Sequence, residues 1–276
     1  MRILRDVAAV RAAVAGAGRV GLVPTMGAFH EGHLSLIRAA RQACDLVVVW
    51  LFVNPTQFNE AADLAGYPRD EERDARLAAE CGADILFAPP VEEVYPDGFA
   101  TTVTVSGIAD VLEGAHRPGH FAGVATVVAK MFAMVAPEVA YFGAKDAQQV
   151  AVVRRMVTDL NLPVRIEVLP IVREPDGLAM SSRNARLDPD QRRRATALHR
   201  GLAAGRAAVA AGERDARAVA DVVAGELAGA SIAAEYIAVV DPGTFAPLER
   251  IERPALIALA ARVGPVRLID NMEVAP

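Results

Sequence analysis

The chain has 276 residues, of which 53% are hydrophobic and 23% charged, and its formal net charge at pH 7 is −5. This composition excludes a disordered polyelectrolyte, and the acidic balance argues against a nucleic-acid surface. No apolar run approaches the about 20 residues of a membrane span, and residues 1–10 lack a signal-peptide core, so we expect a cytoplasmic globular protein that contacts neither membrane nor nucleic acid.

Strands and helices are predicted to alternate through the first 172 residues. Short β-branched apolar runs predict strands at 19–25, 46–53, 83–88, 139–142 and 164–172, and alternation over 101–106 suggests an edge strand. Helical periodicity covers 34–44, 69–81, 121–135 and 146–160. Repeated β-α-β units indicate an α/β, Rossmann-like fold: a parallel sheet with helices on both faces. The two cysteines, Cys44 and Cys81, lie in apolar helical patterns and are expected to be buried thiols in a reducing compartment, with a single disulfide as the alternative.

The character of the chain changes after residue 172. Residues 173–190 are polar and rich in turn formers, and residues 195–230 form an Ala- and Arg-rich helical stretch. Strands are expected at 236–240 and 266–269, while 255–261 fits either a helix or a strand. We therefore predict two domains, 1–172 and a smaller α+β domain over 173–276.

Segments that directly follow strands are the first candidates for a site, because ligands of parallel sheets bind beyond the carboxyl ends of the strands. Residues 24–33 read PTMGAFHEGH. Gly32 would let a ligand approach the backbone, the helix N-terminus offers N–H groups to an anion, and His30 and His33 can donate to phosphate oxygens. A zinc site is the alternative, but no cysteine lies nearby in sequence and Glu31 would point away from the histidines.

The second strand is followed by polar amides with aromatic neighbours. Asn54 and Gln57 stand between Phe52 and Phe58. This pattern suits a small polar ligand with an apolar side, and an ordinary turn is the alternative.

Lysine is rare in this chain. The 29 basic residues include only Lys130 and Lys145, and every other one is arginine. A lysine retained in such a background can mark a site that needs a compact ammonium. Lys145 follows a predicted strand and a Gly143 turn, so it could meet a phosphate, with Asp146 capping the helix or binding a ribose hydroxyl. Lys130 lies within an apolar helix and is expected to extend its amine to solvent.

A polar loop, Met-Ser-Ser-Arg-Asn over residues 180–184, lies between the two predicted domains. Its hydroxyls and arginine suit a polyphosphate. Taken alone, the same composition would also fit a linker.

Several of these segments together carry a family resemblance. The His-x-Gly-His turn and the later Met-Ser-Ser-Arg loop resemble the HIGH and KMSKS-type signatures of the nucleotidylyltransferase superfamily. Six segments, in order, resemble more closely those of the pantothenate synthetases, and they span essentially the whole chain. They are PTMGAFHEGH (24–33), FVNPTQF (52–58), YPR (67–69), HRPGHF (116–121), GAKD (143–146) and DGLAMSSRN (176–184).

The resemblance implies an activity. Members of the family join pantoate to β-alanine with ATP and Mg²⁺, through a pantoyl adenylate, and release AMP and pyrophosphate. They pair a Rossmann-like domain for ATP and pantoate with a smaller C-terminal domain that acts as a lid and is associated with the dimer, and they are cytoplasmic homodimers.

The resemblance also implies roles for individual residues. His33 would be the proton donor, assisted by His30 and Lys145, and Asp74 would lie near Mg²⁺, although Arg73 interrupts the acidic cluster expected there. Pantoate would contact Gln57, which also borders the β-alanine position, Gln149 and Asn54. ATP would contact Met26, Gly27, Ala28, Phe29, His30, Glu31, Gly32, His33, Gly143, Ala144, Lys145, Asp146, Val172, Met180, Ser181, Ser182 and Arg183.

Three other functions remain open from the sequence. A nucleotidyl transferase that stops at adenylation would share the same motifs. A non-catalytic nucleotide-binding module would share the phosphate-binding turns, and a zinc hydrolase would use the histidines.

Overall fold

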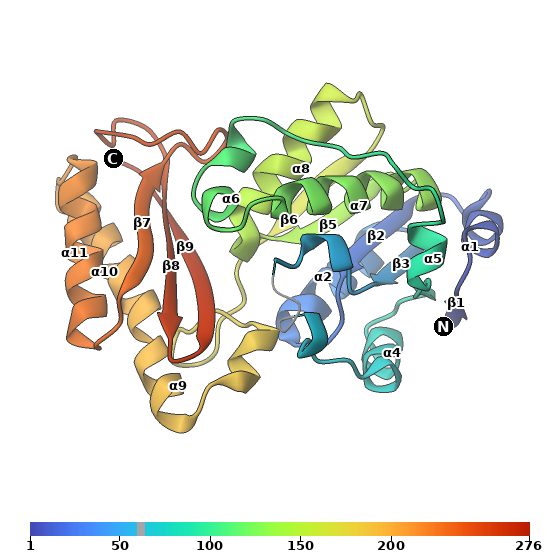
Figure 1. The fold of residues 1–276 in the computed structure, drawn as a ribbon, viewed down its shortest axis with the longest axis horizontal. Helices are drawn as coiled ribbons and strands as arrows, with labels where there is room; N and C mark the ends of the chain where they lie inside the picture. Colours follow the sequence, from blue (N-terminus) through green and yellow to red (C-terminus); the bar gives the residue numbers. More distant parts are fainter. Residues whose placement is uncertain (60–63) are drawn as a thin grey trace. The chain divides into compact units, whose positions relative to one another are not determined.

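The computed structural model describes residues 1–59 and 64–276. These residues divide into two units, Met1–Ala144 with Val152–Pro170 and Lys145–Ala151 with Ile171–Pro276. Each unit has its own sheet (Figure 1). The roles assigned above to domains 1–172 and 173–276 stay predictions.

The first unit is built on a parallel sheet that has six strands within the described residues. Its spatial order is β1-β4-β3-β2-β5-β6, and every neighbouring pair is parallel. This confirms the predicted α/β, Rossmann-like class. The strands are β1 (Arg2–Leu4), β2 (Val20–Thr25), β3 (Leu46–Leu51), β4 (Ile85–Phe87), β5 (Val139–Gly143) and β6 (Arg165–Leu169).

Helices connect these strands. The α-helices of the first unit are α1 (Val7–Val14), α2 (Glu31–Ala43), α4 (Glu71–Glu80), α5 (Val91–Val94), α6 (Glu113–His116) and α7 (His120–Val135). Short 3₁₀ helices are η1 (Pro55–Gln57), η2 (Ile108–Asp110) and η3 (Ala144–Asp146), and α8 (Ala147–Asp159) contributes residues to both units.

Both faces of the parallel sheet are buried. Ile37 and Ala40 of α2 and Ala78 of α4 pack against alternate strand residues such as Val23 and Val49. The intervening strand residues point to the other face, and Leu22, Val48, Trp50, Ile85 and Phe87 are also buried. Burial on two faces explains why these strands read as continuous apolar runs in the sequence.

The second unit is an antiparallel sheet covered by helices. β7 (Ala234–Val240), β8 (Ala255–Val263) and β9 (Val266–Val274) pair in that order. α10 (Ala197–Ala210) and α11 (Ala216–Gly229) lie side by side along this sheet (Figure 1), with α9 (Pro189–Ala195) and η4 (Ser182–Arg186) before them. Gly205 of α10 permits the close approach of α10 to α11, because a Cβ at Gly205 would lie 2.9 Å from the side chain of Val223 on α11. Buried Leu198, Leu202 and Ile257 belong to the core between helices and sheet.

Two predicted elements are wrong. The stretch 195–230 is not one helix, because Gly212 adopts φ +105° and Asp215 caps a new helix, α11. Residues 101–106 form no strand; the backbone N–H of Val103 instead donates to the Thr126 hydroxyl at 2.9 Å. The ambiguous segment 255–261 is a strand.

Smaller differences concern the ends of elements and the cysteines. β1 and α1 were not predicted, since three strand residues are too few for a periodic signal. Cys44 is a buried free thiol, whereas the free thiol Cys81 is only half-buried. Among the described residues, no helix combines the length and apolar character needed to cross a bilayer.

Leu202 tests the core of the second unit. It is fully buried, so Leu202→Ala should lower the free energy of unfolding by about 2–5 kcal/mol through lost burial and a residual cavity. Leu160→Ala is the matched control, because Leu160 is 50% exposed. Urea unfolding followed by circular dichroism measures both, and equal losses for the two variants would contradict the assigned core.

Candidate active site

The first unit contains a switch point between β2 and β5. Strands extend in opposite directions from this pair, with β3, β4 and β1 beyond β2 and β6 beyond β5. Open α/β sheets bind ligands at such a point, outside the carboxyl ends of the strands. β2 ends at Thr25, directly before Met26, and β5 ends at Gly143, directly before Ala144. Two predicted ATP motifs therefore start at the same edge of one sheet.

The turn after β2 is held in an unusual backbone conformation. Gly27 has φ +90° and Ala28 φ +52°, both in the left-handed region. A Cβ at Gly27 would lie 2.9 Å from Leu51 and 3.0 Å from Asp74, so glycine is required there on both counts.

The two histidines cap α2 with their side chains. Nδ1 of His30 accepts the N–H of Gly32 at 3.2 Å, and Nδ1 of His33 accepts the N–H of His30 at 3.4 Å. The ring centroids lie 4.1 Å apart. Because each Nδ1 accepts a backbone hydrogen, the proton of each neutral ring lies on Nε2. The pair therefore combines two N–H donors with the positive end of a helix, which favours an anion.

The residues between the histidines have local partners. A Cβ on Gly32 would lie 2.9 Å from the His30 ring, so Gly32 makes room for the cap, and the approach of a ligand to its backbone stays a prediction. Glu31 forms an ion pair with Arg38 on the same helix, as expected for a side chain that points away from the histidines.

Asp74 is a buried carboxylate that holds the turn from α4. Oδ2 accepts the N–H of Ala28 at 2.7 Å, and Oδ1 accepts that of Phe29 at 2.9 Å. Arg73 donates to the Phe29 carbonyl at 3.1 Å, so adjacent residues of α4 hold both sides of one peptide segment. The side chain of Asp74 is only 1% exposed. These contacts position the residues that lead into His30.

Two of the three residues predicted to bind pantoate, Asn54 and Gln57, form a pair that contacts the predicted ATP turn through Gln57. Asn54 and Gln57 are buried, and Nδ2 of Asn54 donates to Oε1 of Gln57 at 3.1 Å. Nε2 of Gln57 lies 2.8 Å from Sδ of Met26. Two segments that are 31 positions apart in the chain thus meet at the carboxyl edge of β2 and β3.

The second unit contains the predicted ATP residues from Lys145 onward. Lys145 and Asp146 form an ion pair at 3.8 Å, and Asn271 of β9 donates to the Lys145 carbonyl at 2.9 Å. Gln149 lies half-buried in the first turn of α8. Lys130, in the first unit, lies 4.6 Å from the centre of the Phe99 ring, which gives that lysine a structural cation–π contact.

A hairpin supports the loop Met180–Arg183 from within the second unit. Met180 donates to the Val172 carbonyl at 3.0 Å, which joins two predicted ATP residues. Ser181 caps η4 by accepting the N–H of Arg183 at 3.2 Å, and Ser182 begins that helix.

Arg173 anchors this hairpin to β9. It donates to both oxygens of buried Asp270, at 2.7 and 3.0 Å, and to the Gly177 carbonyl at 3.0 Å. His199 packs so closely that a Cβ on Gly177 would lie 2.1 Å from its ring. Burial and the charge of Arg173 lower the pKa of His199, so this imidazole is neutral at pH 7. The loop after the hairpin thereby has a rigid base.

The described residues do not form a metal cage of their own. They contain no group of three or more His, Cys, Asp and Glu side chains that could hold an ion. Both oxygens of Asp74 accept backbone N–H groups, so Asp74 acts on the turn, and its predicted contact with Mg²⁺ stays a prediction.

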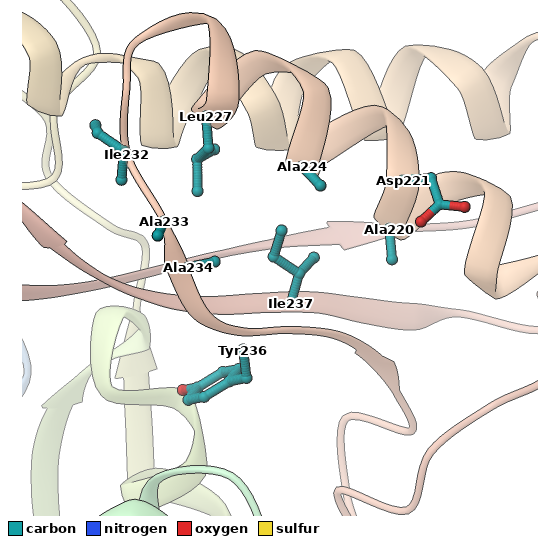
Figure 2. A pocket seen from close by; sticks show the side chains of 9 residues that line it. All are labelled: Ala220, Asp221, Ala224, Leu227, Ile232, Ala233, Ala234, Tyr236 and Ile237. Atoms are coloured by element: carbon teal, nitrogen blue, oxygen red, sulfur yellow. The ribbon is translucent and has the colours of Figure 1, made fainter.

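A groove of about 400 Å³ lies between α11 and β7 (Figure 2). Leu227 and Ile237 point toward each other across it, and Asp221 and Tyr236 are among its polar neighbours. None of the predicted site residues lines this groove.

The comparisons with known proteins decide the family. The family model for pantoate-β-alanine ligase matches residues 2–273. The chain belongs to the pantoate–β-alanine ligase family. It is 54% identical to the pantothenate synthetase of Moorella thermoacetica, over 99% of this chain and 98% of that protein, and 53% identical to that of Cereibacter sphaeroides, over 99% of both.

Solved structures agree with this family. The crystal structure of pantothenate synthetase from Thermus thermophilus matches with a TM-score of 0.96 and 48% identity, over 100% of both chains. The pantoate–β-alanine ligase from Francisella tularensis, complexed with β-γ ATP and β-alanine, matches with a TM-score of 0.83 and 33% identity, over 99% of this chain and 97% of that one.

Some residues of this ligase that contact the predicted site were missed from the sequence. Tyr95 donates to Asn54 at 2.8 Å, although it stands in an acidic segment with no motif. Asp270 and Asn271 lie close to the C-terminus and reach Arg173 and Lys145 through β9. No local pattern could reveal these contacts. Only the 116–121 segment gave a signal: Arg117 and His120 contact the Gln57 carbonyl at 3.2 and 2.9 Å, and neither had been given a role.

A substitution at Asp74 tests how the turn after β2 is held. In Asp74→Ala the N–H groups of Ala28 and Phe29 lose their acceptors, so the free energy of unfolding should fall by about 1–3 kcal/mol. Glu72→Ala, which removes an exposed acid from the same turn of α4, should change it by less than about 0.5 kcal/mol. Urea unfolding compares the two variants. An Asp74→Ala protein as stable as the parent would show that the hydrogen bonds from Ala28 and Phe29 to Asp74 do not stabilise the fold.

Proposed function

We propose that this ligase makes pantothenate in two steps, through a pantoyl adenylate, with release of AMP and pyrophosphate. The observation that carries the proposal is the meeting of two motifs at the carboxyl edge of β2 and β3, where Gln57 contacts Met26 in the turn that leads to the paired histidines. The complex of the Francisella relative with an ATP compound and β-alanine supports the same substrates.

The first step joins two anions, which sets what the site must provide. A carboxylate oxygen of pantoate attacks the α-phosphorus of ATP, and the bond to the bridging oxygen of pyrophosphate breaks. Negative charge grows on the phosphate oxygens, so donors placed in advance lower the barrier. The Nε2–H groups of His30 and His33 and the N-terminus of α2 can do this, with His33 as the proton donor to the leaving group.

The resemblance assigns the remaining ATP contacts to Gly143 and Ala144 and to residues of the second unit. Lys145 would supply a compact ammonium and Arg183 a planar fork to phosphate oxygens. The remaining ATP contacts proposed from the resemblance are Gly143, Ala144, Asp146, Val172, Met180, Ser181 and Ser182. The loop Met180–Arg183 is expected from the resemblance to protect the adenylate from hydrolysis by water.

The second step forms the amide. The neutral amine of β-alanine attacks the acyl carbon of the adenylate, the bond to the AMP oxygen breaks, and the amine loses a proton. Gln57, Gln149 and Asn54 are proposed to hold pantoate for both steps. The nucleophile of each step is a substrate group, so the protein does not have to supply one. Magnesium on the ATP phosphates, a homodimer and a cytoplasmic location remain expectations from the resemblance.

His33→Ala tests the proton donor. Loss of one transition-state donor should lower the rate of AMP formation by at least about a hundredfold while the protein stays folded. His116→Ala is the matched control, because His116 is an exposed histidine on α6, and its rate should stay close to that of the parent. A folded His33→Ala enzyme with near-normal turnover would contradict the assignment.

Isotope exchange tests the order of the steps. If the adenylate forms first, the enzyme should exchange labelled pyrophosphate into ATP with pantoate and Mg²⁺ alone. Exchange is expected because the two turns proposed to bind phosphate, after β2 and β5, begin at the edge of the sheet where Gln57 lies, so that ATP and pantoate could meet there before β-alanine binds. Exchange that strictly requires β-alanine would refute the two-step reaction.

A further inference from the structure

The side-chain amide of Asn54 has one orientation that satisfies its backbone neighbours. Its Oδ1 lies 3.4 Å from the backbone nitrogen of Thr56, which can only donate. Its Nδ2 lies 3.2 Å from the carbonyl oxygen of Gly123, which can only accept. The hydroxyls of Tyr95 and Thr56 add donors to the same Oδ1, at 2.8 and 3.0 Å. The oxygen of Asn54 therefore faces Tyr95 and its nitrogen faces inward.

The orientation of Asn54 determines that of Gln57. Nδ2 of Asn54 is a donor, so the Gln57 atom 3.1 Å away must be the oxygen Oε1. The NH₂ group of Gln57 then faces the other way, toward Sδ of Met26 at 2.8 Å. The backbone of Gln57 is fixed as well, because His120 contacts its carbonyl and a Cβ on Gly123 would lie 3.0 Å from its nitrogen.

We propose that Tyr95 is a positioning residue that acts through Asn54, so that Gln57 meets pantoate as a hydrogen-bond donor only. This inference rests on the proposed function, because that is where pantoate is placed at Gln57. An amide that could rotate would accept from a substrate hydroxyl as readily as donate to it. An amide held by Asn54 requires an acceptor oxygen on the ligand, and a carboxylate is purely an acceptor. Gln57 thereby favours the carboxylate, the strongest acceptor of the acid, at the position where the ligand replaces contact with Met26.

The environment of Tyr95 suits this role. Its ring lies between Phe52 and Phe99, with centroid distances of 6.2 and 5.1 Å, so the hydroxyl is held in place by apolar packing. Burial raises the pKa of the Tyr95 phenol above its ordinary value of 10.0. The phenol therefore keeps its proton, and its ability to donate, across the neutral pH range.

The first experiment removes only the hydroxyl. In Tyr95→Phe the KM for pantoate should rise about 5- to 10-fold, as expected for one lost hydrogen bond, while the KM for ATP stays within about twofold of the parent. Tyr141→Phe is the matched control: this tyrosine is buried on β5, its hydroxyl faces Cys44 at 3.4 Å, and both KM values should be unchanged. An unchanged KM for pantoate in Tyr95→Phe, or equal rises for pantoate and ATP, would overturn the proposal.

The second experiment reverses the polarity of Gln57. Gln57→Glu keeps the shape and the oxygen that accepts from Asn54, but it places a second acceptor toward the substrate. Pantoate should then be repelled, and its KM should rise by at least about a hundredfold, with ATP binding unchanged by calorimetry. If Gln57 instead accepted from a pantoate hydroxyl, the glutamate would bind as well or better, and that result would overturn the proposal.

A measurement on the parent enzyme covers the case in which a variant does not fold. The side-chain NH₂ signal of Gln57 in a ¹⁵N–¹H spectrum should move downfield when pantoate and a non-hydrolysable ATP analogue bind, and no movement would overturn the proposal. Failure of the proposed two-step function is distinguished in the parent enzyme, where exchange of pyrophosphate into ATP would then require β-alanine.

Discussion

The pairing of β2 with β5 is the constraint on which the site of the first unit depends. Strands are added outward from this pair in opposite directions, so the chain leaves both strands at one edge with no helix passing over it. The turn of the histidines and the Gly143 turn are placed there by topology alone. The 3₁₀ helix after β3 reaches the same edge, which brings Gln57 to Met26. The sheet therefore sets the positions of these segments, and a small number of buried polar contacts set the orientations of their side chains.

Those contacts are made by groups whose hydrogen-bonding choices are limited. Asp74 can only accept, so it holds the two N–H groups of a left-handed turn that would otherwise lack partners. His30 and His33 satisfy N–H groups at the start of α2 through Nδ1, which places their protons on the opposite nitrogen. In the second unit, Arg173 and Asp270 provide a similar rigid base for the loop of Met180. Each of these side chains has its orientation set by contacts within the protein itself.

Much of the first unit could be predicted from the sequence because its signals are local. Five of the six strands are short apolar runs, and the helix after His30 has clear periodicity and a polar start. The partners of the site could not be predicted in this way. Asp74 lies 46 positions from Ala28, Tyr95 lies 41 positions from Asn54, and Asn271 lies 126 positions from Lys145. Only the packing of distant elements brings such residues together. The break between α10 and α11 was missed for a different reason, because alanine-rich sequence on both sides hides a short turn at Gly212.

Trp50 is the single tryptophan of the chain, and its surroundings make it a natural optical probe. It is buried in the middle of the parallel sheet, with the rings of Phe52 and Phe87 at centroid distances of 6.0 and 4.9 Å. Its carbonyl accepts the Thr25 hydroxyl at 2.7 Å, one residue before the turn that begins at Met26. Tryptophan fluorescence thus originates entirely in the first unit, beside the edge where ligands are expected. Nucleotide titrations can therefore be followed without a label, and the tryptophan emission reports on the packing of the first unit.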